Sequence, residues 1–230
     1  MRLLVVSDIH ANFEALRAIP DSFDYVLCLG DLVDYGPEPE ACLQWLRDRD
    51  AICVRGNHDQ AVAAHVPCRG NPGLAQEAEA TRRLFQDRLL PADASYLGTL
   101  PFQTRLRLGG MRFHLVHATP SDPLYTYVRP GDRGRWAREL ERVSADVLLV
   151  GHTHLPMILR IGEKTVINPG SVGQPRDGDP RASFAVIEDG RPRLDRVAYD
   201  VEATVRRLEK SALSPNVVRH LSTLLRTGTS

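Results

Sequence analysis

The 230-residue sequence predicts an α/β fold in which two β-sheets stack on each other and helices cover their outer faces. In the first half of the chain, short apolar runs alternate with helical patterns, which is typical of parallel βαβ units. In the second half, pairs of strand-like runs flank short turns that contain glycine, which indicates β-hairpins. The chain has no low-complexity linker and no repeat of fixed period, so we expect one domain over residues 1–230.

Strand and helix patterns alternate from the N-terminus onward. Buried strands are expected at residues 3–6, 25–29 and 51–54, because each is a short apolar run that leads into polar or turn-forming residues. Helices are expected at residues 12–19 and 38–49, because apolar side chains in these segments recur at helical spacing. The order strand, helix, strand, helix, strand predicts a parallel arrangement.

The rest of the chain is predicted to be helical and connecting at first and then rich in hairpins. Residues 60–100 form the helical and connecting part, with prolines as breaks. The predicted hairpins pair residues 105–108 with 112–116, 157–161 with 165–168, and 183–187 with 193–199. Their turns contain Gly109-Gly110, Gly162-Glu163 and Asp189-Gly190. A further strand is expected at residues 147–150 and helices at 136–143, near Val201 and near Asn216.

The charge balance limits the class of partner. Acidic and basic residues number 29 each, so the net charge is zero at pH 7. This argues against broad binding to nucleic acid or to an anionic membrane, and we expect no stable nucleic acid complex. A net charge of zero does not exclude a small phosphate-bearing ligand, because a protein that binds a metal ion gains local positive charge from the ion. We find neither a signal-peptide pattern nor an apolar stretch of about 20 residues, and therefore expect a cytoplasmic protein.

The four cysteines offer no zinc-binding pattern. They stand at positions 28, 42, 53 and 68 and form no CxxC pair. Cys28 lies in a core strand pattern and Cys42 on a helical pattern. We therefore expect reduced, partly buried thiols, as is usual in the cytosol.

Polar clusters follow five of the strand-like runs. They are Asp8-Ile9-His10, Gly30-Asp31, Gly56-Asn57-His58-Asp59, His117, and Gly151-His152-Thr153-His154. Strand ends on one edge of a sheet converge, and carboxylates together with imidazoles bind divalent metals such as Mn, Fe or Zn. Each cluster alone would be a cap or a turn. Their joint occurrence predicts a metal site, because seven polar groups that are costly to bury need a common function.

The spacing within the clusters suggests roles for single residues. Asp8 and His10 are two apart, so in an extended conformation both would point to one side and hold one metal. Asp31 would bridge two metals with its two oxygens, and Asn57 would offer a neutral amide oxygen. His152 and His154 would either share a face or divide between the metals across a turn.

His58 differs from the other histidines because it directly follows a predicted ligand and would point elsewhere. Its imidazole is a candidate acid that protonates the leaving oxygen. Asp59 is the candidate that holds the tautomer of this imidazole.

In this order, the five motifs strongly resemble those of the calcineurin-like metallophosphoesterase family. The later stretch Asn168-Pro169-Gly170-Ser171-Val172-Gly173-Gln174-Pro175-Arg176 resembles the small bacterial and archaeal phosphodiesterase branch. The resemblance implies a four-layer αββα sandwich of two mixed sheets with a dinuclear site. Carried onto this chain, it assigns Asp8, His10, Asp31 and His154 to one metal. It assigns Asp31, Asn57, His117 and His152 to the other metal and makes His58 the acid.

The expected function is metal-dependent hydrolysis of a phosphodiester or a nucleotide phosphoanhydride, with a metal-bridging hydroxide as the nucleophile. Two divalent ions are expected, from among Mn, Fe, Zn and Co, with Mn or Fe favoured. The enzymatic alternative is a phosphomonoesterase or protein phosphatase. The alternative of another class is a non-catalytic, metal-containing interaction module, against which the intact His58 argues. The sequence does not exclude a homo-oligomer, because the edge strands of the predicted hairpins could pair between two chains.

Several residues outside the ligand set are candidates for contact with a small phosphate-ester or nucleotide substrate. Asn12 either caps the helix after His10 or touches phosphate with its amide. Arg176 is either an exposed loop cation or a bidentate phosphate clamp. Tyr35, Tyr125 and Tyr127 lie in loops near the predicted site, where they would either pack or stack on a nucleobase.

Overall fold

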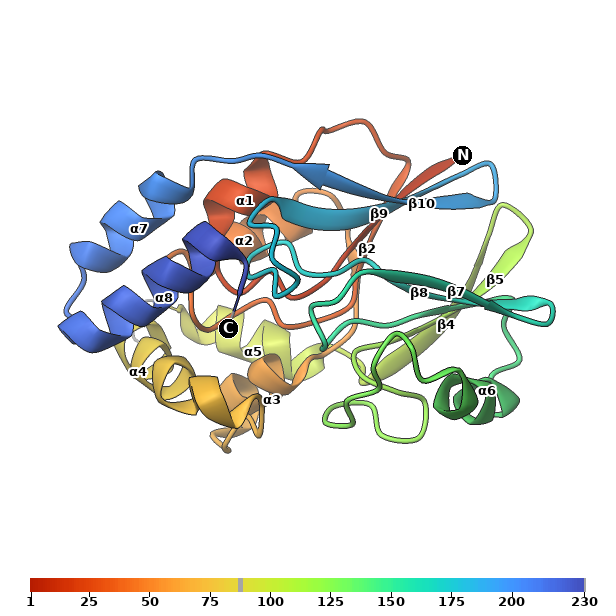
Figure 1. The fold of residues 1–230 in the computed structure, drawn as a ribbon, viewed down its shortest axis with the longest axis horizontal. Helices are drawn as coiled ribbons and strands as arrows, with labels where there is room; N and C mark the ends of the chain where they lie inside the picture. Colours follow the sequence, from red (N-terminus) through yellow and green to blue (C-terminus); the bar gives the residue numbers. More distant parts are fainter. Residues whose placement is uncertain (87–88, 230) are drawn as a thin grey trace.

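Two stacked sheets form the centre of the molecule (Figure 1). The computed structural model describes residues 1–86 and 89–229. Within these residues, the first sheet contains β1 (Arg2–Val6), β2 (Tyr25–Cys28), β3 (Ile52–Cys53), β9 (Ala182–Glu188) and β10 (Arg191–Val197), in the order β10-β9-β1-β2-β3. The second contains β4 (Gln103–Leu108), β5 (Met111–Val116), β6 (Val147–Leu149), β7 (Met157–Ile161) and β8 (Lys164–Asn168), in the order β4-β5-β6-β8-β7.

Each sheet has a parallel part flanked by antiparallel hairpin strands. β1, β2 and β3 pair in parallel, and so do β5, β6 and β8. The three hairpins turn at the predicted glycines, where Gly110, Gly162 and Gly190 have φ values of 82°, 58° and 79°. Glycine adopts this left-handed conformation without the steric cost that a Cβ would add. The parallel parts direct the carboxyl ends of both sheets toward one region.

Strand residues alternate between an inner and an outer core. Leu3 and Val5 point into the core between the two sheets, together with Phe113 of β5. Leu4 and Val6 point the other way, into a core that the helices close. Because successive side chains of a strand point to opposite faces, a continuous apolar run such as Leu3–Val6 is buried on both sides.

Helices cover the outer face of each sheet. α1 (Phe13–Arg17), α2 (Pro39–Arg47) and α5 (Pro91–Thr99) contribute to the core on the outer side of the first sheet. α6 (Arg133–Glu141) packs Trp136 and Leu140 against the outer side of the second sheet. The predicted four-layer αββα sandwich is therefore confirmed.

A separate group of helices packs beside the sandwich, on the left of Figure 1. It contains α3 (Asn57–Ala64), the short 3₁₀ helix η1 (Pro72–Leu74), α4 (Ala75–Gln86), α7 (Val201–Glu209) and α8 (Pro215–Thr227). The prediction for residues 60–100 agrees with α3, η1, α4 and α5, while residues 87–88 of that range lie outside the described residues. The apolar faces of α7 and α8 bury Val205, Leu208 and Leu221 in this group.

The predicted elements are present, with shifted ends. α1 spans Phe13–Arg17 instead of residues 12–19, because Asn12 is its cap and not part of the helix. α6 begins at Arg133 instead of Trp136, because the Asp132 side chain accepts the Arg135 N–H and starts the helix earlier. Side-chain caps of this kind, rather than apolar spacing, determine where a helix begins.

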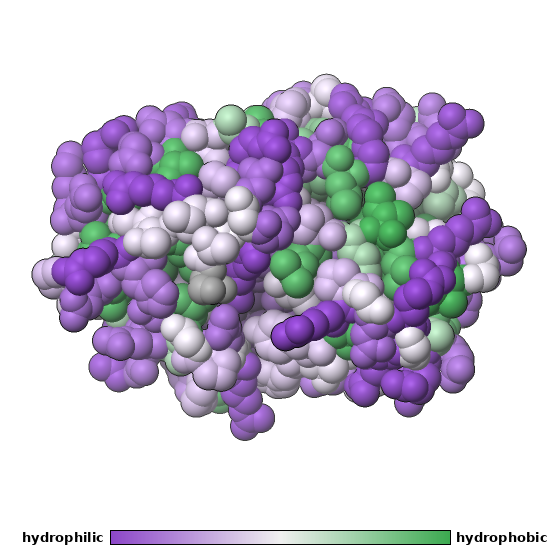
Figure 2. Space-filling view, viewed as in Figure 1, coloured by the Kyte–Doolittle hydropathy of each residue, from purple (hydrophilic) through white to green (hydrophobic). Residues whose placement is uncertain are grey.

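The surface is mainly polar. Figure 2 shows a face on which hydrophilic side chains predominate, and Ile158 of β7 and Leu194 of β10 are among the exposed hydrophobic side chains of the chain. Across the described residues, we find no helix long and apolar enough to span a bilayer. All four cysteines lie in the described part, where they are buried and free of disulfides.

Candidate metal centre

The carboxyl ends of five strands bring seven polar side chains together. They follow β1, β2, β3, β5 and β6, and every one of them is buried. The seven side chains are Asp8, His10, Asp31, Asn57, His117, His152 and His154. The expectation that these residues converge at the strand ends therefore agrees with the structure.

The backbone that presents these side chains is left-handed rather than extended. Asp8 and His10 have φ values of 51° and 47°, and His152 and His154 have φ values of 66° and 59°. The condition under which we expected Asp8 and His10 to share one side, an extended backbone, is not met, but both side chains still reach one group of potential ligands. Non-glycine residues in such conformations cost on the order of 1–3 kcal/mol each, and they persist where surrounding contacts hold them. Here the N–H groups of Asp8 and His10 donate to main-chain oxygens of the next strand end.

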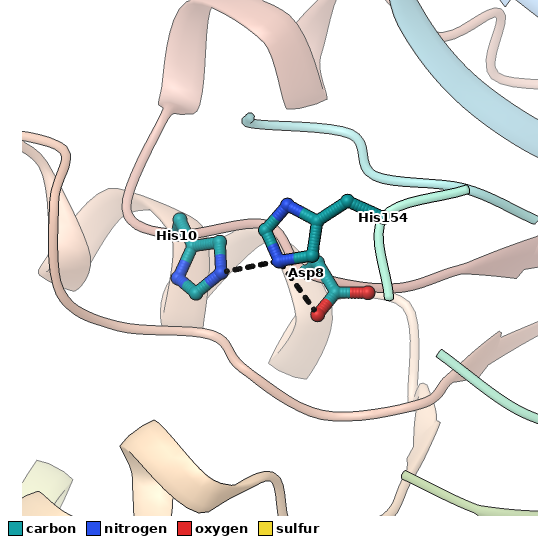
Figure 3. A group of neighbouring side chains, drawn as sticks. All are labelled: Asp8, His10 and His154. Carbon is teal, nitrogen blue, oxygen red and sulfur yellow. Dashed lines mark hydrogen bonds and ion pairs between the residues drawn. The ribbon is translucent and has the colours of Figure 1, made fainter. Parts of the chain in front are cut away.

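Asp8, His10 and His154 form the first group of potential ligands (Figure 3). The Nε2 atoms of His10 and His154 are 3.2 Å apart, and Asp8 Oδ1 is 3.3 Å from His154 Nε2. On the far side of each ring, His10 Nδ1 lies 3.0 Å from the Val33 carbonyl and His154 Nδ1 lies 2.6 Å from the Gln174 carbonyl. A carbonyl only accepts, so both Nδ1 atoms carry the proton and both Nε2 atoms present lone pairs.

This group consists of acceptors that face one another with no donor between them. Burial lowers the pKa of both His10 and His154, so both rings are neutral. Asp8 Oδ1 is buried and has no hydrogen-bond partner among the described residues. Facing lone pairs repel unless a cation lies among them, so this donor set fits a divalent metal ion.

A second group, which includes Asn57, brings potential ligand atoms equally close together. His117 Nε2 lies 3.1 Å from His152 Nδ1 and 3.0 Å from Asn57 Oδ1. The remaining polar atoms of these side chains face main-chain carbonyls. His117 Nδ1 lies against that of Leu29, His152 Nε2 against that of Tyr125, and Asn57 Nδ2 donates to that of Cys68. Without a metal, a proton would have to separate the acceptors. Burial opposes that proton, but Asp31 and Asp8 outweigh the burial and raise the pKa of His117 to about 9.

Asp31 lies between the two groups. Its Oδ2 atom is 3.3 Å from His117 Nε2 and 3.9 Å from His10 Nε2. Its Oδ1 atom accepts the N–H of His58 at 2.9 Å, so Oδ2 alone faces the histidines, whereas we predicted bridging through both oxygens. Gly56 makes room for this arrangement, because a Cβ at that position would lie 2.0 Å from Oδ1.

The two histidines of the Gly151–His154 motif belong to different groups. His154 lies with Asp8 and His10, and His152 lies with Asp31 and His117. Of the two alternatives open from the sequence, the structure thus adopts the division across a turn. Both residues have left-handed backbone conformations, and their rings reach different groups.

His58 borders the same region and is held by Asp34. Its Nδ1 atom donates to Asp34 Oδ2 at 2.7 Å, and Asp34 also pairs with Arg82. The Nε2 atom points toward the metal groups, 4.0 Å from Asp31 Oδ2. Burial opposes the charged imidazolium, but the carboxylates of Asp31 and Asp34 outweigh it and raise the pKa of His58 to about 9. His58 is therefore positioned to present a proton at Nε2.

The prediction that Asp59 holds the tautomer of His58 is wrong. The Asp59 carboxylate accepts the main-chain N–H groups of Asp31, Leu32 and Gly56 at 2.8–2.9 Å. As the third residue of α3, it turns back over the start of the helix, away from the His58 ring. Asp59 thus orders the loop that carries Asp31.

Sequence reasoning missed the role of Asp34. It lies in the Gly30–Asp34 stretch that carries the family resemblance, and it is 24 residues from His58. Its place within a matched motif was the available signal. The carboxylate next to His58 in the sequence, Asp59, seemed the simpler partner, but adjacent side chains of a helix do not face each other.

Asn12 and Arg176, the two candidates for contact with the substrate, differ in how many of their polar atoms form hydrogen bonds within the protein. Asn12 accepts from Ala15 and Thr204 and donates to Gly173 and Tyr199, which favours its role as a helix cap. Arg176 is half-buried and donates to Gln174 at 2.6 Å. Its Nε atom is buried without a hydrogen-bond partner among the described residues.

Arg176 also lies close enough to the centre to act on it electrostatically. After burial, its charge is the next cause that lowers the pKa of His154. A cation at this position would attract an anion that approaches the metal groups. A role for Arg176 in substrate binding stays a prediction.

The three loop tyrosines lie at different depths around the centre. Tyr35 is buried, with its ring centroid 4.8 Å from that of His10. Tyr127 stacks on His152 at 3.9 Å between centroids, yet 46% of the residue is exposed. Tyr125 accepts from His152 through its main-chain oxygen. Of the three tyrosines, Tyr127 is exposed, Tyr125 is partly buried and Tyr35 is buried.

Comparisons with known proteins agree with this architecture. The family model described as a calcineurin-like phosphoesterase superfamily domain matches residues 1–189. The crystal structure of a metallophosphoesterase from Sphaerobacter thermophilus is 31% identical, covers 100% of both chains and gives a TM-score of 0.82. Phosphodiesterase YfcE of Escherichia coli K12 is 27% identical over 82% of this chain and 88% of its own length. Serine/threonine-protein phosphatase 1 of Salmonella typhimurium is 28% identical over 73% and 86%.

Proposed function

The chain belongs to the calcineurin-like phosphoesterase superfamily, and from this premise we propose that it is a dinuclear metal-dependent enzyme that hydrolyses a phosphodiester or a nucleotide phosphoanhydride. One observation carries the proposal. Two buried sets of carboxylate, amide and imidazole atoms that can bind a metal converge around Asp31 Oδ2. Such a pair of sets suits two divalent cations that share one carboxylate oxygen.

The proposed ligands form two sets that share Asp31. Asp8, His10, Asp31 and His154 would hold one ion, and Asp31, Asn57, His117 and His152 the other. Ions held there would supply a nucleophile from water near neutral pH and offset the charge of the phosphate oxygens. Mixed carboxylate and imidazole ligands suit Mn or Fe, and also Zn or Co.

His58 would serve as the acid for the leaving group. Its Nε2 proton faces the space beside Asp31 Oδ2, where a bound phosphate would lie. The hydrogen bond from Nδ1 to Asp34 fixes the orientation of the ring and supports its positive charge. When the bond from phosphorus to the leaving oxygen breaks, that oxygen would take the Nε2 proton.

Hydrolysis of model esters tests the proposal. With Mn added, we expect the protein to hydrolyse bis(p-nitrophenyl) phosphate with a higher kcat/KM than p-nitrophenyl phosphate. The similarity to the Salmonella typhimurium phosphatase supports the alternative, a monoesterase or protein phosphatase, which would reverse this order. Two bound metals with no turnover of either ester would instead support a non-catalytic module.

Removal of the metals is expected to lower the melting temperature. A site filled at 100 times its Kd stabilises the fold by about 2.7 kcal/mol. In a chain of this size, that corresponds to a decrease of about 5–10 °C per ion when a chelator removes it. Calorimetry before and after chelation, with metal content measured in parallel, checks the shift, and added Mn should restore it. An unchanged melting temperature of a metal-free sample would contradict the assignment of the site.

A further inference from the structure

A cavity of about 610 Å³ lies beside the metal centre, on the side of His58. The segment between α3 and α4 forms one wall, and α4 forms the other. Val66, Pro67, Pro72 and Ala75 give it an apolar lining. Its volume falls in the range that binds small organic molecules, about 300–1,000 Å³.

Three contacts join this cavity to the metal centre. The main-chain oxygen of Cys68, in the cavity wall, accepts the Asn57 amide at 2.8 Å. Gly70, in the same wall, lies against His58, because a Cβ there would be 3.1 Å from His58 Nε2. The Arg69 guanidinium lies 5.6 Å from the ring centroid of Tyr125, whose main-chain oxygen accepts from His152. The cavity wall therefore lies next to His58, whose Nε2 atom would protonate the leaving group.

The cavity carries more positive than negative charge. Arg69, Arg82 and Arg83 line it, against one lining carboxylate, Glu79. Arg82 is paired with Asp34, and Arg83 forms an exposed pair with Glu79, which holds it only weakly. Among the described residues, Arg69 forms no ion pair. Arg69 and Arg83 are thus available to an anion.

We propose that this cavity receives the leaving group, and that Arg69 and Arg83 select a leaving group that bears a phosphate of its own. This inference rests on the proposed phosphoesterase function. A water that has lost one proton to solvent would add its oxygen to phosphorus, the bond from phosphorus to the leaving oxygen would break, and that oxygen would take the Nε2 proton of His58. The departing molecule would then be a nucleoside phosphate, with its base and sugar against the apolar wall and its phosphate on the arginines.

The test compares two substrates in matched variants. Every leaving group of diadenosine tetraphosphate keeps a phosphate, whereas that of bis(p-nitrophenyl) phosphate has none. In the double variant Arg69→Gln/Arg83→Gln, we expect the ratio of kcat/KM for the first substrate to that for the second to fall about 10- to 100-fold. The control Arg105→Gln/Arg107→Gln removes the same charge from exposed positions on β4 and should leave the ratio unchanged.

Binding of the product gives a second measurement that does not depend on turnover. Calorimetry should detect AMP binding to the chelator-treated wild-type protein and a 10- to 100-fold weaker affinity in the double variant. An unchanged substrate ratio, or unchanged AMP affinity, would overturn the inference while the phosphoesterase function stands. Failure of the wild-type protein to hydrolyse any ester would refute the function itself, and the AMP measurement would still decide what the cavity binds.

Discussion

Replacement of Asp31 by asparagine is expected to remove most of the phosphoesterase activity. Asp31 Oδ2 is the one atom that lies between both acceptor groups, and the substitution exchanges a carboxylate for a neutral amide there. The loss should be at least about 10²–10³-fold in kcat/KM, the size expected when one preorganised electrostatic contact is removed. The Oδ1 position can still accept the His58 N–H, so the fold should be retained.

Elemental analysis and kinetics on the same samples check this result. The Asp31→Asn protein should lose at least one metal, because a ligand shared by two ions affects both. Asp195→Asn, in a partly exposed carboxylate of β10 that pairs with Arg193, is the matched control and should keep wild-type metal content and rate. Full hydrolysis of an aryl phosphodiester by Asp31→Asn, with unchanged metal content, would refute the dinuclear assignment.

Replacement of His58 by glutamine is expected to slow the enzyme in a way that depends on the leaving group. A general acid contributes typically about 10²–10⁴-fold, and most where the leaving oxygen is a poor leaving group. An alkyl phosphodiester should therefore lose far more activity than bis(p-nitrophenyl) phosphate, whose leaving group departs without protonation. Neither ligand set proposed above includes His58, so both metals should stay bound, and loss of a metal would instead make His58 a ligand together with His10 and Asp31.

Rates for a series of aryl and alkyl esters separate this role from a structural one. A merely structural residue would reduce all rates by the same factor, and that outcome would exclude His58 as the acid. Asp34→Asn should show the same dependence to a smaller degree, because it weakens the support of the ring but leaves the ring in place. His220→Gln, in an exposed histidine of α8 that pairs with Glu77, is the matched control.

Features that depend on a few neighbouring residues were predictable from the sequence, whereas features that depend on contacts between distant residues were not. Buried strands such as Leu3–Val6 and the three glycine turns were predictable, because apolar spacing and positive φ are properties of a few neighbouring residues. The helix ends were less accurate, since single caps such as Asn12 and Asp132 set them. The strand and helix patterns predicted two stacked sheets with helices outside, and the family resemblance added the division of the ligands between two metals.

The sequence by itself determined which chemically costly side chains stand at the strand ends, because strand ends are visible in the local pattern. Only the tertiary structure decided which partners they meet. His10 and His154 are 144 residues apart, and Asp34 reaches His58 across 24 residues. Contacts of this kind depend on how loops from two sheets close over one another, and left-handed turns at Asp8 and His152 aim the side chains in directions that strand spacing does not predict. For the same reason, the arginine-lined cavity beside His58 depends on how α3 and α4 pack and is not predictable from local sequence patterns.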